Sequence, residues 1–403
     1  MTGKLRAALL AGALIAASGQ AWAEPVTLPE ALAQAAGNSP RIAQAKAQAE
    51  AAEARARQAG ASPNPELSLE VDNFGGTGPY RNVRSAETTL ALSQRFELGG
   101  KRGARMAVAS AERDVAMLGY KRAQADLERD IRIAYAELRA AEDRAVLARD
   151  NVAQAEELAR SAALFVEVGR DPPLRKLRAD ALLAETKAEQ ARTFGELLTA
   201  RRALGDLIGS SDPELSAVGF GDDAAPTLLP PANPTLDEQI AEAESNAARA
   251  RIRVAQAGSV PDLTASAGVR RINDGRETAF VAGLALPLPI RDRNRGNIAA
   301  AGSDSLATEA ALAQARLNTA RAQHDARMLL GAAEERIAAL SGPGLAQAEE
   351  ALRIARIGYS AGKFSLIDLL DAQSALTSAR KSLIEARLDR ARALAALIRA
   401  NAQ

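Results

Sequence analysis

The stretch LERDIRIAYAELRAAEDRAVLARDNVAQAEELA, residues 127–159, decides the fold of this chain. Its apolar residues recur in alternating steps of four and three, which is the spacing of a helix that packs along a seam. No proline occurs between residues 104 and 168, so we expect one helix of roughly 95 Å there, at about 1.5 Å per residue. Small alanines at many seam positions predict close spacing between neighbouring helices. The seam comprises Leu127, Ile131, Ala134, Leu138, Ala141, Ala145, Ala148, Val152, Ala155 and Ala159.

A second helical pattern closes the chain, and it carries two neighbouring seams. Each seam repeats every seven residues, and the two are offset by one residue. Two seams predict contacts with helices on both sides, which favours a ring of helices. A simple antiparallel coiled-coil rod is the alternative that this pattern leaves open. One seam comprises Leu370, Thr377, Ile384, Ala391 and Ile398, and the other comprises Leu369, Leu376 and Leu383.

Four stretches alternate apolar and polar residues with a period of two, which predicts β-strands with one apolar face. In the first stretch, Leu67, Leu69 and Val71 alternate with polar residues. A transmembrane β-barrel requires such strands, although a soluble β-hairpin domain is compatible with the same pattern. Four strands cannot close a barrel, so they would have to be pooled between chains, and a trimer would supply about twelve. The strands are expected at about residues 65–73, 87–97, 262–272 and 277–289.

The chain contains an internal repeat. Residues 27–31 (TLPEA) resemble residues 235–239 (TLDEQ), and residues 58–63 (QAGASP) resemble residues 256–261 (QAGSVP). The offset between the halves falls from 208 to 193 along the chain, so the second half is shorter, mostly in its opening helix. Each half is predicted to form a helix, a β-hairpin and a long α-hairpin. The expected boundaries are a first repeat at 24–209 with long helices at about 102–168 and 172–209, a linker at 210–234, and a second repeat at 235–400 with long helices at about 297–358 and 365–399.

The composition argues against several classes of function. Lysine and arginine number 51 against 50 aspartate and glutamate residues, so the chain lacks the basic excess typical of nucleic-acid binding. It has no cysteine and a single histidine, His324, so neither disulfides nor a histidine-based metal cluster can be built within one chain. No constellation of residues suits an enzyme active site. We therefore expect neither catalysis nor a bound cofactor.

The N-terminus predicts export from the cytoplasm. Basic residues precede an apolar run at residues 7–17, and the sequence AWA at residues 21–23 is a small-residue cleavage site. This arrangement is typical of a secretory signal peptide, residues 1–23, with cleavage after Ala23. Glu24 follows in place of a cysteine, so we expect no N-terminal lipid anchor. No later stretch is apolar over the about 18 residues of a membrane helix, so any membrane span is expected to be β.

The order of helix, β-hairpin and long α-hairpin, repeated twice behind a signal peptide, resembles the TolC-type outer-membrane efflux proteins. The resemblance covers residues 24–400, essentially the whole mature chain. Residues 286–297 (LPLPIRDRNRGN) resemble the family's strand-to-helix junction, and residues 358–373 (GYSAGKFSLIDLLDAQ) resemble its periplasmic tip and entrance. Residues 96–105 (FELGGKRGAR) resemble the matching junction of the first half, in a form associated with the heavy-metal (cobalt–zinc–cadmium, CzcC-like) branch.

The resemblance implies a mainly α protein with a transmembrane β-barrel contribution. The expected assembly is a homotrimer with one barrel of about twelve strands in the outer membrane and a periplasmic α-helical barrel. The implied partners are outer-membrane lipid, a periplasmic membrane-fusion adaptor and an inner-membrane RND transporter. The implied function is passive conduction of cargo handed over by these partners, above all divalent heavy-metal cations. The alternatives are the same duct in multidrug or solvent efflux or type I secretion, and a soluble periplasmic coiled-coil scaffold or adaptor.

The resemblance also assigns candidate residues at the hairpin tips. Asp368 and Asp371 are three residues apart on one helix face, and matching carboxylates of the family form rings near the periplasmic constriction. Such a ring would favour cations. Tyr359 matches a tyrosine of the family's tip latch, whereas Phe364 stands where the latch has an arginine, so the latch is expected to be weaker or differently wired. The remaining tip residues are Gly169, Arg170, Gly362 and Lys363, of which the two glycines are expected to end the long helices.

The strand-to-helix junctions contain glycine, proline and clustered basic residues. Glycines are expected to permit the turn from strand to helix, whereas Pro287 and Pro289 cannot donate to a ladder and are expected to end the sheet. The basic residues are expected near the lower membrane interface, or else at an ordinary solvated helix start. The junction glycines are Gly99, Gly100, Gly103 and Gly296, and the basic residues are Lys101, Arg102, Arg105, Arg291, Arg293 and Arg295.

Overall fold

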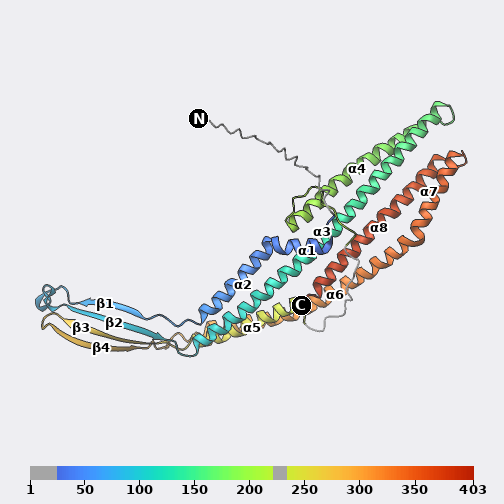
Figure 1. The fold of residues 1–403 in the computed structure, drawn as a ribbon. Helices are drawn as coiled ribbons and strands as arrows, with labels where there is room; N and C mark the ends of the chain where they lie inside the picture. Colours follow the sequence, from blue (N-terminus) through green and yellow to red (C-terminus); the bar gives the residue numbers. More distant parts are fainter. Residues whose placement is uncertain (1–24, 221–233) are drawn as a thin grey trace, which may run out of the picture.

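The computed structural model describes residues 25–220 and 234–403, so the expected signal peptide and much of the expected linker lie outside the described residues. The described chain is elongated, with a β-sheet at one end and the tips of two α-hairpins at the other (Figure 1). None of its described helices combines the length and the apolar character needed to cross a membrane.

The first half opens with two helices where one was expected. Pro40 begins the second of them, and a proline disfavours helical geometry at the residue before it, so the chain turns at Ser39. The long α-hairpin then follows the β-hairpin, and Pro173 occupies the first position of its second helix. The elements are α1 (Leu28–Asn38), α2 (Pro40–Ala59), β1 (Glu66–Asp72), β2 (Glu87–Phe96), α3 (Lys101–Glu167) and α4 (Pro173–Ile208), with short 3₁₀ turns at Gly78–Tyr80 and Val83–Ser85.

The second half repeats this order with a shorter opening helix and an interrupted long helix. One helix was expected over residues 297–358, but a π-helical turn divides it, visible as the bend between α6 and α7 in Figure 1. Pro343 lacks an amide hydrogen and crowds the preceding turn, and Gly342 adopts φ −91° and ψ −118°. The elements are α5 (Leu236–Ala257), β3 (Leu263–Ile272), β4 (Glu277–Ala285), α6 (Arg295–Ala339), η3 (Leu340–Gly344), α7 (Leu345–Ser360) and α8 (Leu366–Ala400).

The four strands form one antiparallel sheet in the order β1-β2-β3-β4, and the β2–β3 pair joins the two halves. The register places Leu69, Leu90, Val269 and Phe280 side by side across the sheet. Directly paired residues share a face, so one face is apolar, and Phe280 on it is 89% exposed. The opposite face carries polar pairs, including the hydrogen bond of 3.0 Å that Arg270 Nε donates to Thr89 Oγ1.

Helix α3 is the central column of the helical part. Nine of its ten seam residues are buried and Ala145 is partly buried, so the predicted seam is confirmed as the packing face. Seam residues between Leu127 and Ala141 pack against α1, α2 and α4, and Ala159 near the other end packs in a cluster with α7 and α8. Tyr135 is fully buried, and its hydroxyl accepts a hydrogen bond of 2.8 Å from the Val218 amide.

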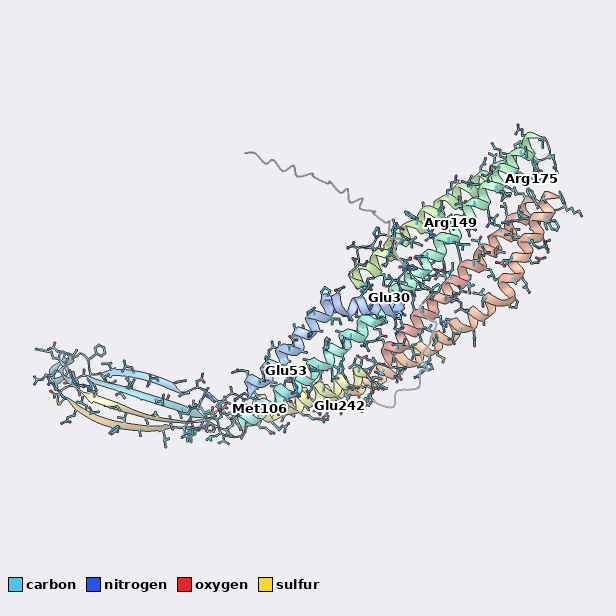
Figure 2. All side chains as sticks on the ribbon, in the orientation of Figure 1. Glu30, Glu53, Met106, Arg149, Arg175 and Glu242 are labelled. Atoms are coloured by element: carbon cyan, nitrogen blue, oxygen red, sulfur yellow. The ribbon has the colours of Figure 1, made fainter. Side chains whose placement is uncertain are left out.

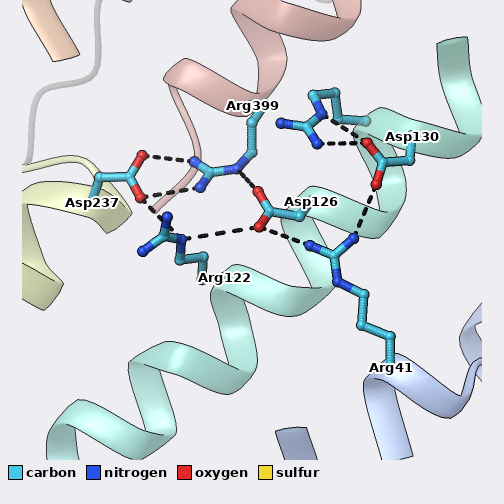
Figure 3. A network of polar contacts seen from close by, with 7 residues as sticks. Arg41, Arg122, Asp126, Asp130, Asp237 and Arg399 are labelled. Carbon is cyan, nitrogen blue, oxygen red and sulfur yellow. Dashed lines mark hydrogen bonds and ion pairs between the residues drawn. The ribbon is translucent and has the colours of Figure 1, made fainter. Parts of the chain in front are cut away.

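A network of ion pairs joins four helices where the two halves meet (Figure 3). Arg399 of α8 binds Asp237 of α5 through two contacts of 2.9 and 3.1 Å, and its Nε donates to Asp126 of α3. Arg41 of α2 bridges Asp126 and Asp130 at 3.0 Å each. The Arg399 and Asp126 side chains are only 11% and 16% exposed, so the centre of this joint between the halves is buried, whereas Arg41 and Asp237 at its edge are partly exposed.

Candidate functional site

Both α-hairpins end in the same turn. Gly169 and Gly362 adopt φ +72°, a conformation that other residues rarely adopt, so both glycines end their helices as predicted. The next amide reaches back across the turn in each case: Arg170 N donates to Phe165 O, and Lys363 N donates to Gly358 O, both at 2.8 Å. These bonds close a Schellman motif at each tip.

At the second tip an aromatic ring packs directly on a glycine of the helix that it follows. The Phe364 ring lies against Gly358, where an added Cβ would come within 2.1 Å of it. Gly358 therefore has to be glycine for this ring position. Phe364, which stands at the expected latch position, packs on its own turn in place of reaching the other hairpin.

Tyr359 belongs to the buried cluster that joins the two hairpins near their tips. Its ring centroid lies 6.1 Å from that of Phe165, and the Arg170 guanidinium lies 4.7 Å over the Phe165 ring. Burial raises the pKa of Tyr359, and the nearby Asp171 carboxylate raises it further, so the phenol keeps its proton at neutral pH. Asp171 forms an ion pair with Arg175, which lies at the tip of the first hairpin (Figure 2). The phenol therefore lies near an ion pair of the first hairpin.

The two candidate carboxylates have different surroundings. Ser365 caps α8, and its amide and hydroxyl donate hydrogen bonds of 2.8 and 2.7 Å to Asp368 Oδ2. These bonds, the one from the hydroxyl above all, lower the pKa of Asp368. Asp371 is exposed and has no hydrogen bond or ion pair within the described part of the chain. Asp368 therefore stabilises the start of α8, whereas the charge of Asp371 is free.

Asp371 lines a groove of about 910 Å³ between the two hairpins. Its walls come mainly from α4 and α8 and carry serine, threonine, glutamine and charged side chains. Lys381 of α8 crosses to Glu189 of α4 at 2.8 Å. Hydrogen bonds from Arg192 and Lys381 lower the pKa of Glu189 to about 2.

The strand-to-helix junctions use fewer glycines than expected. Gly99 and Gly100 adopt φ +67° and +73°, and Gly99 also lies so close to Val260 that a Cβ would meet that side chain at 2.6 Å. The prediction that Gly103 supplies an unusual conformation is wrong, because α3 has already begun and Gly103 is helical. Gly296 is likewise inside α6, and Asn294, with φ 58°, makes the turn of the second junction. β4 ends at Ala285, just before Pro287 and Pro289.

Two of the basic residues at the junctions are bound within the chain. Lys101 Nζ lies 2.7 Å from Asp262 Oδ1, which also accepts from the Leu98 amide at 3.3 Å. Arg105 pairs with Glu97. These pairs tie the start of α3 to the end of β2 and to the residue before β3.

Within residues 25–220 and 234–403, no group of three or more histidine, aspartate or glutamate side chains is arranged to hold a metal ion. The joint around Arg399 and the groove between α4 and α8 were missed by sequence reasoning. Their members are far apart in the chain and belong to no motif, so no local signal could have located them.

The chain is similar to metal-resistance proteins along most of its length. It is 30% identical over 367 residues to the cobalt-zinc-cadmium resistance protein CzcC of Cupriavidus metallidurans, covering 89% of this chain and 85% of that protein. It is 33% identical over 267 residues to the nickel-cobalt-cadmium resistance protein NccC of Alcaligenes xylosoxydans xylosoxydans, covering 65% of this chain and 60% of that protein.

Solved outer-membrane proteins share the fold. The outer membrane protein VceC of Vibrio cholerae superimposes with a TM-score of 0.76 at 22% identity, covering 93% of this chain and 95% of that one. CusC superimposes with a TM-score of 0.80 at 20% identity, covering 93% and 92%. The sequence model described as "Outer membrane efflux protein" matches residues 31–210 and 232–403. The chain therefore belongs to the outer membrane efflux protein family.

Proposed function

We propose that this chain is the outer-membrane duct of a tripartite efflux system and that its cargo is divalent heavy-metal cations. The similarity to the cobalt-zinc-cadmium resistance protein, over 89% of this chain, carries the proposal. The duct is passive: an inner-membrane RND transporter and a periplasmic adaptor hand over the cargo, which leaves through a water-filled bore. The division into repeats at 24–209 and 235–400, and export by a signal peptide cleaved after Ala23 without a lipid anchor, belong to the same proposal.

The proposed assembly is a homotrimer that pools three sheets into one barrel. β1 and β4 end the described sheet and have no further partner strand among residues 25–220 and 234–403. Unpaired peptide groups cost several kcal/mol each in hydrocarbon, so both edges need neighbours before the sheet can enter a membrane. The exposed apolar face, with Leu67 at 71% and Phe280 at 89%, supports lipid on the outside of this barrel.

The proposed entrance lies at the hairpin tips, where the turns at 168–174 and 359–366 would also dock the adaptor. Asp371 supplies the free charge of the acidic collar, and Asp368 adds a second carboxylate that its cap keeps ionised. In a trimer both would repeat three times, giving a collar that attracts cations. Tyr359 against Phe165 and Asp171 forms the contact that has to part when the entrance opens.

A resistance profile tests the proposed cargo. A deletion strain of the source bacterium should become sensitive to zinc, cobalt or cadmium while its tolerance of organic antibiotics stays the same, and a plasmid copy should restore resistance. Sensitivity to antibiotics alone would sink the metal assignment and support a drug duct. Recovery of the protein in the soluble periplasm would contradict the duct itself.

Single-channel recording tests the collar. Asp371→Asn should reduce cation selectivity and block by divalent metals, with Asp325→Asn on α6 as an exposed control of equal charge change. Asp368→Asn should also loosen the start of α8, because it weakens the cap. Unchanged selectivity in Asp371→Asn channels that assemble normally would rule out the collar.

A further inference from the structure

Of the three basic residues at the first junction, two are bound within the chain, whereas Arg102 is exposed and has no hydrogen bond or ion pair with a described residue. Lys101 and Arg105 are bound by Asp262 and Glu97. Arg291, Arg293 and Arg295 are exposed, and none of them forms a hydrogen bond or ion pair with another residue that the structure describes. Three guanidinium groups within five residues are thus left without an internal partner.

The loop that carries these arginines is held in a fixed shape. Asn294 N donates to Asp292 Oδ1 at 2.9 Å, and Asn294 Nδ2 donates to the Ala255 carbonyl of α5 at 2.6 Å. Asn297 Nδ2 closes the turn by donating to Asn294 Oδ1 at 2.6 Å. Asp292, the single carboxylate of the loop, is therefore used to hold the backbone, and the arginines are presented from a braced turn.

The arginines directly follow a row of exposed apolar side chains. Phe280, Leu284, Leu288 and Ile290 are 89%, 76%, 71% and 74% exposed, and they occupy even-numbered positions from β4 into the junction. The first arginine comes one residue after Ile290. An apolar row that ends at unpaired guanidinium groups matches the boundary between the hydrocarbon and the anionic headgroups of a membrane.

We propose that Arg291, Arg293 and Arg295 bind the phosphate headgroups of anionic glycerophospholipids at the edge of the membrane-facing sheet. The proposal rests on the membrane insertion proposed above and adds a headgroup preference to it. Guanidinium groups bind phosphate oxygens through paired hydrogen bonds. The apolar row beside the arginines favours a lipid over an acidic protein segment, since only a lipid supplies an acyl chain to cover that row.

Lipid binding to the purified full-length protein in neutral detergent tests the proposal. Phosphatidylglycerol and phosphatidylcholine are titrated separately, and bound lipid is counted by native mass spectrometry. The wild-type protein should prefer phosphatidylglycerol. The variant Arg291→Gln/Arg293→Gln/Arg295→Gln should lose this preference, by roughly fivefold for each arginine that acts and roughly a hundredfold for all three.

Two further variants distinguish a specific lipid site from a general effect of positive charge and from an effect of misfolding. Arg316→Gln/Arg321→Gln/Arg327→Gln removes the same charge from α6, away from the junction, and should keep the preference. Arg291→Lys/Arg293→Lys/Arg295→Lys keeps the charge and should retain a preference weaker than that of the wild type, because lysine binds phosphate as a point charge.

The outcomes decide the proposal directly. Equal phosphatidylglycerol preference in the wild type and the glutamine variant would overturn it. Full competition by glycerol 3-phosphate would indicate a site for a soluble phosphate, and full competition by polyglutamate would indicate an acidic protein partner, so either result also overturns it. Conductance of the wild-type protein in phosphatidylcholine bilayers is measured separately. Its absence contradicts the proposed duct, whereas the headgroup preference is read in detergent and does not depend on conduction.

Discussion

The two α-hairpins have the same topology and different long helices. α3 continues without a break for 67 residues and buries 15 of them. The matching helix of the second half is divided into α6 and α7, which bury four residues each. At the repeat offset of 193, Gly342-Pro343-Gly344 correspond to Arg149-Asp150-Asn151 of α3, which contain no helix breaker. The first hairpin is therefore a continuous column, and the second is a segmented arm packed beside it.

The contacts between the hairpins sharpen this contrast. Near the centre of the molecule a buried joint around Arg399 fixes α8 to the first half. Toward the tips the hairpins meet through a buried apolar cluster that includes Leu158, Leu369 and Tyr359, and through polar contacts such as the bridge from Lys381 to Glu189. The two connections therefore differ in kind: ion pairs dominate the joint, and apolar packing dominates the contact toward the tips.

The largest effect is expected from breaking the joint. Arg399→Ala removes the least exposed cation of the joint, leaving Asp126 with Arg41 and both aspartates with longer contacts to Arg122. Because Asp237 is partly exposed and other cations remain, the free energy of unfolding should fall by about 3 kcal/mol, the lower end for a broken buried pair. Urea denaturation measures the loss. Arg392→Ala on the same helix removes an exposed pair with Glu137 and should cost less than about 1 kcal/mol. Equal losses in the two variants would contradict a buried joint.

Moving the helix breaker from one hairpin to the other tests the difference between the long helices. Asp150→Pro in α3 should lower the free energy of unfolding by about 3 kcal/mol, because proline removes an internal hydrogen bond and crowds the preceding turn. Pro343→Ala should cause no loss, since the chain has already left the α-helical path there. Asp150→Ala is the control for the side chain. Urea denaturation curves compare the stabilities of the three variants. An Asp150→Pro variant as stable as Asp150→Ala would contradict the difference between the two long helices.

The second tip should be sensitive to a single methyl group. Gly358→Ala forces the Phe364 ring off its turn and should destabilise the protein by about 1 to 3 kcal/mol. Gly331→Ala in α6 meets open space and should stabilise it by up to about 1 kcal/mol. Thermal unfolding should show a lower melting temperature for Gly358→Ala and a higher one for Gly331→Ala. Protease cleavage near residue 362 should increase in Gly358→Ala only. The idea fails if Gly358→Ala is neutral and the tip stays protected.

The smallest effect is expected from acidifying the bridge between the hairpins. The pKa of Glu189 is lowered from 4.5 to about 2 in the folded protein, so its contribution is present above pH 4.5 and is lost as the pH falls toward 2. Glu189 is partly exposed, so this contribution should be below about 1 kcal/mol. Stability measured at descending pH should therefore show wild type and Glu189→Gln converging. When Lys381→Ala is present in both proteins, the stability difference that Glu189→Gln causes should already be smaller at neutral pH. If the stabilities of wild type and Glu189→Gln fall in parallel with pH, the link between Glu189 ionisation and stability is excluded.

The sequence by itself determined the periodic features of the protein. The α3 seam, the two seams of α8 and the alternating strands follow from side-chain periods of about 3.6 and 2 residues, which depend only on near neighbours in the chain. The glycines that end both hairpins were also predictable, because Gly169 and Gly362 stand between two helical patterns and need positive φ locally. The resemblance to the efflux family rested on the repeated order of these elements and on the junction and tip motifs.

Only the tertiary structure decided which charges are bound and which are free. Arg399 meets Asp126 and Asp237 across 273 and 162 residues, and Asp262 neutralises Lys101 across 161. Lys101 and Arg293 look alike in the sequence, yet one is paired and the other is not. The physical reason is that ion pairing depends on distances of a few ångströms between atoms, and folding sets these distances between residues that are remote in the chain.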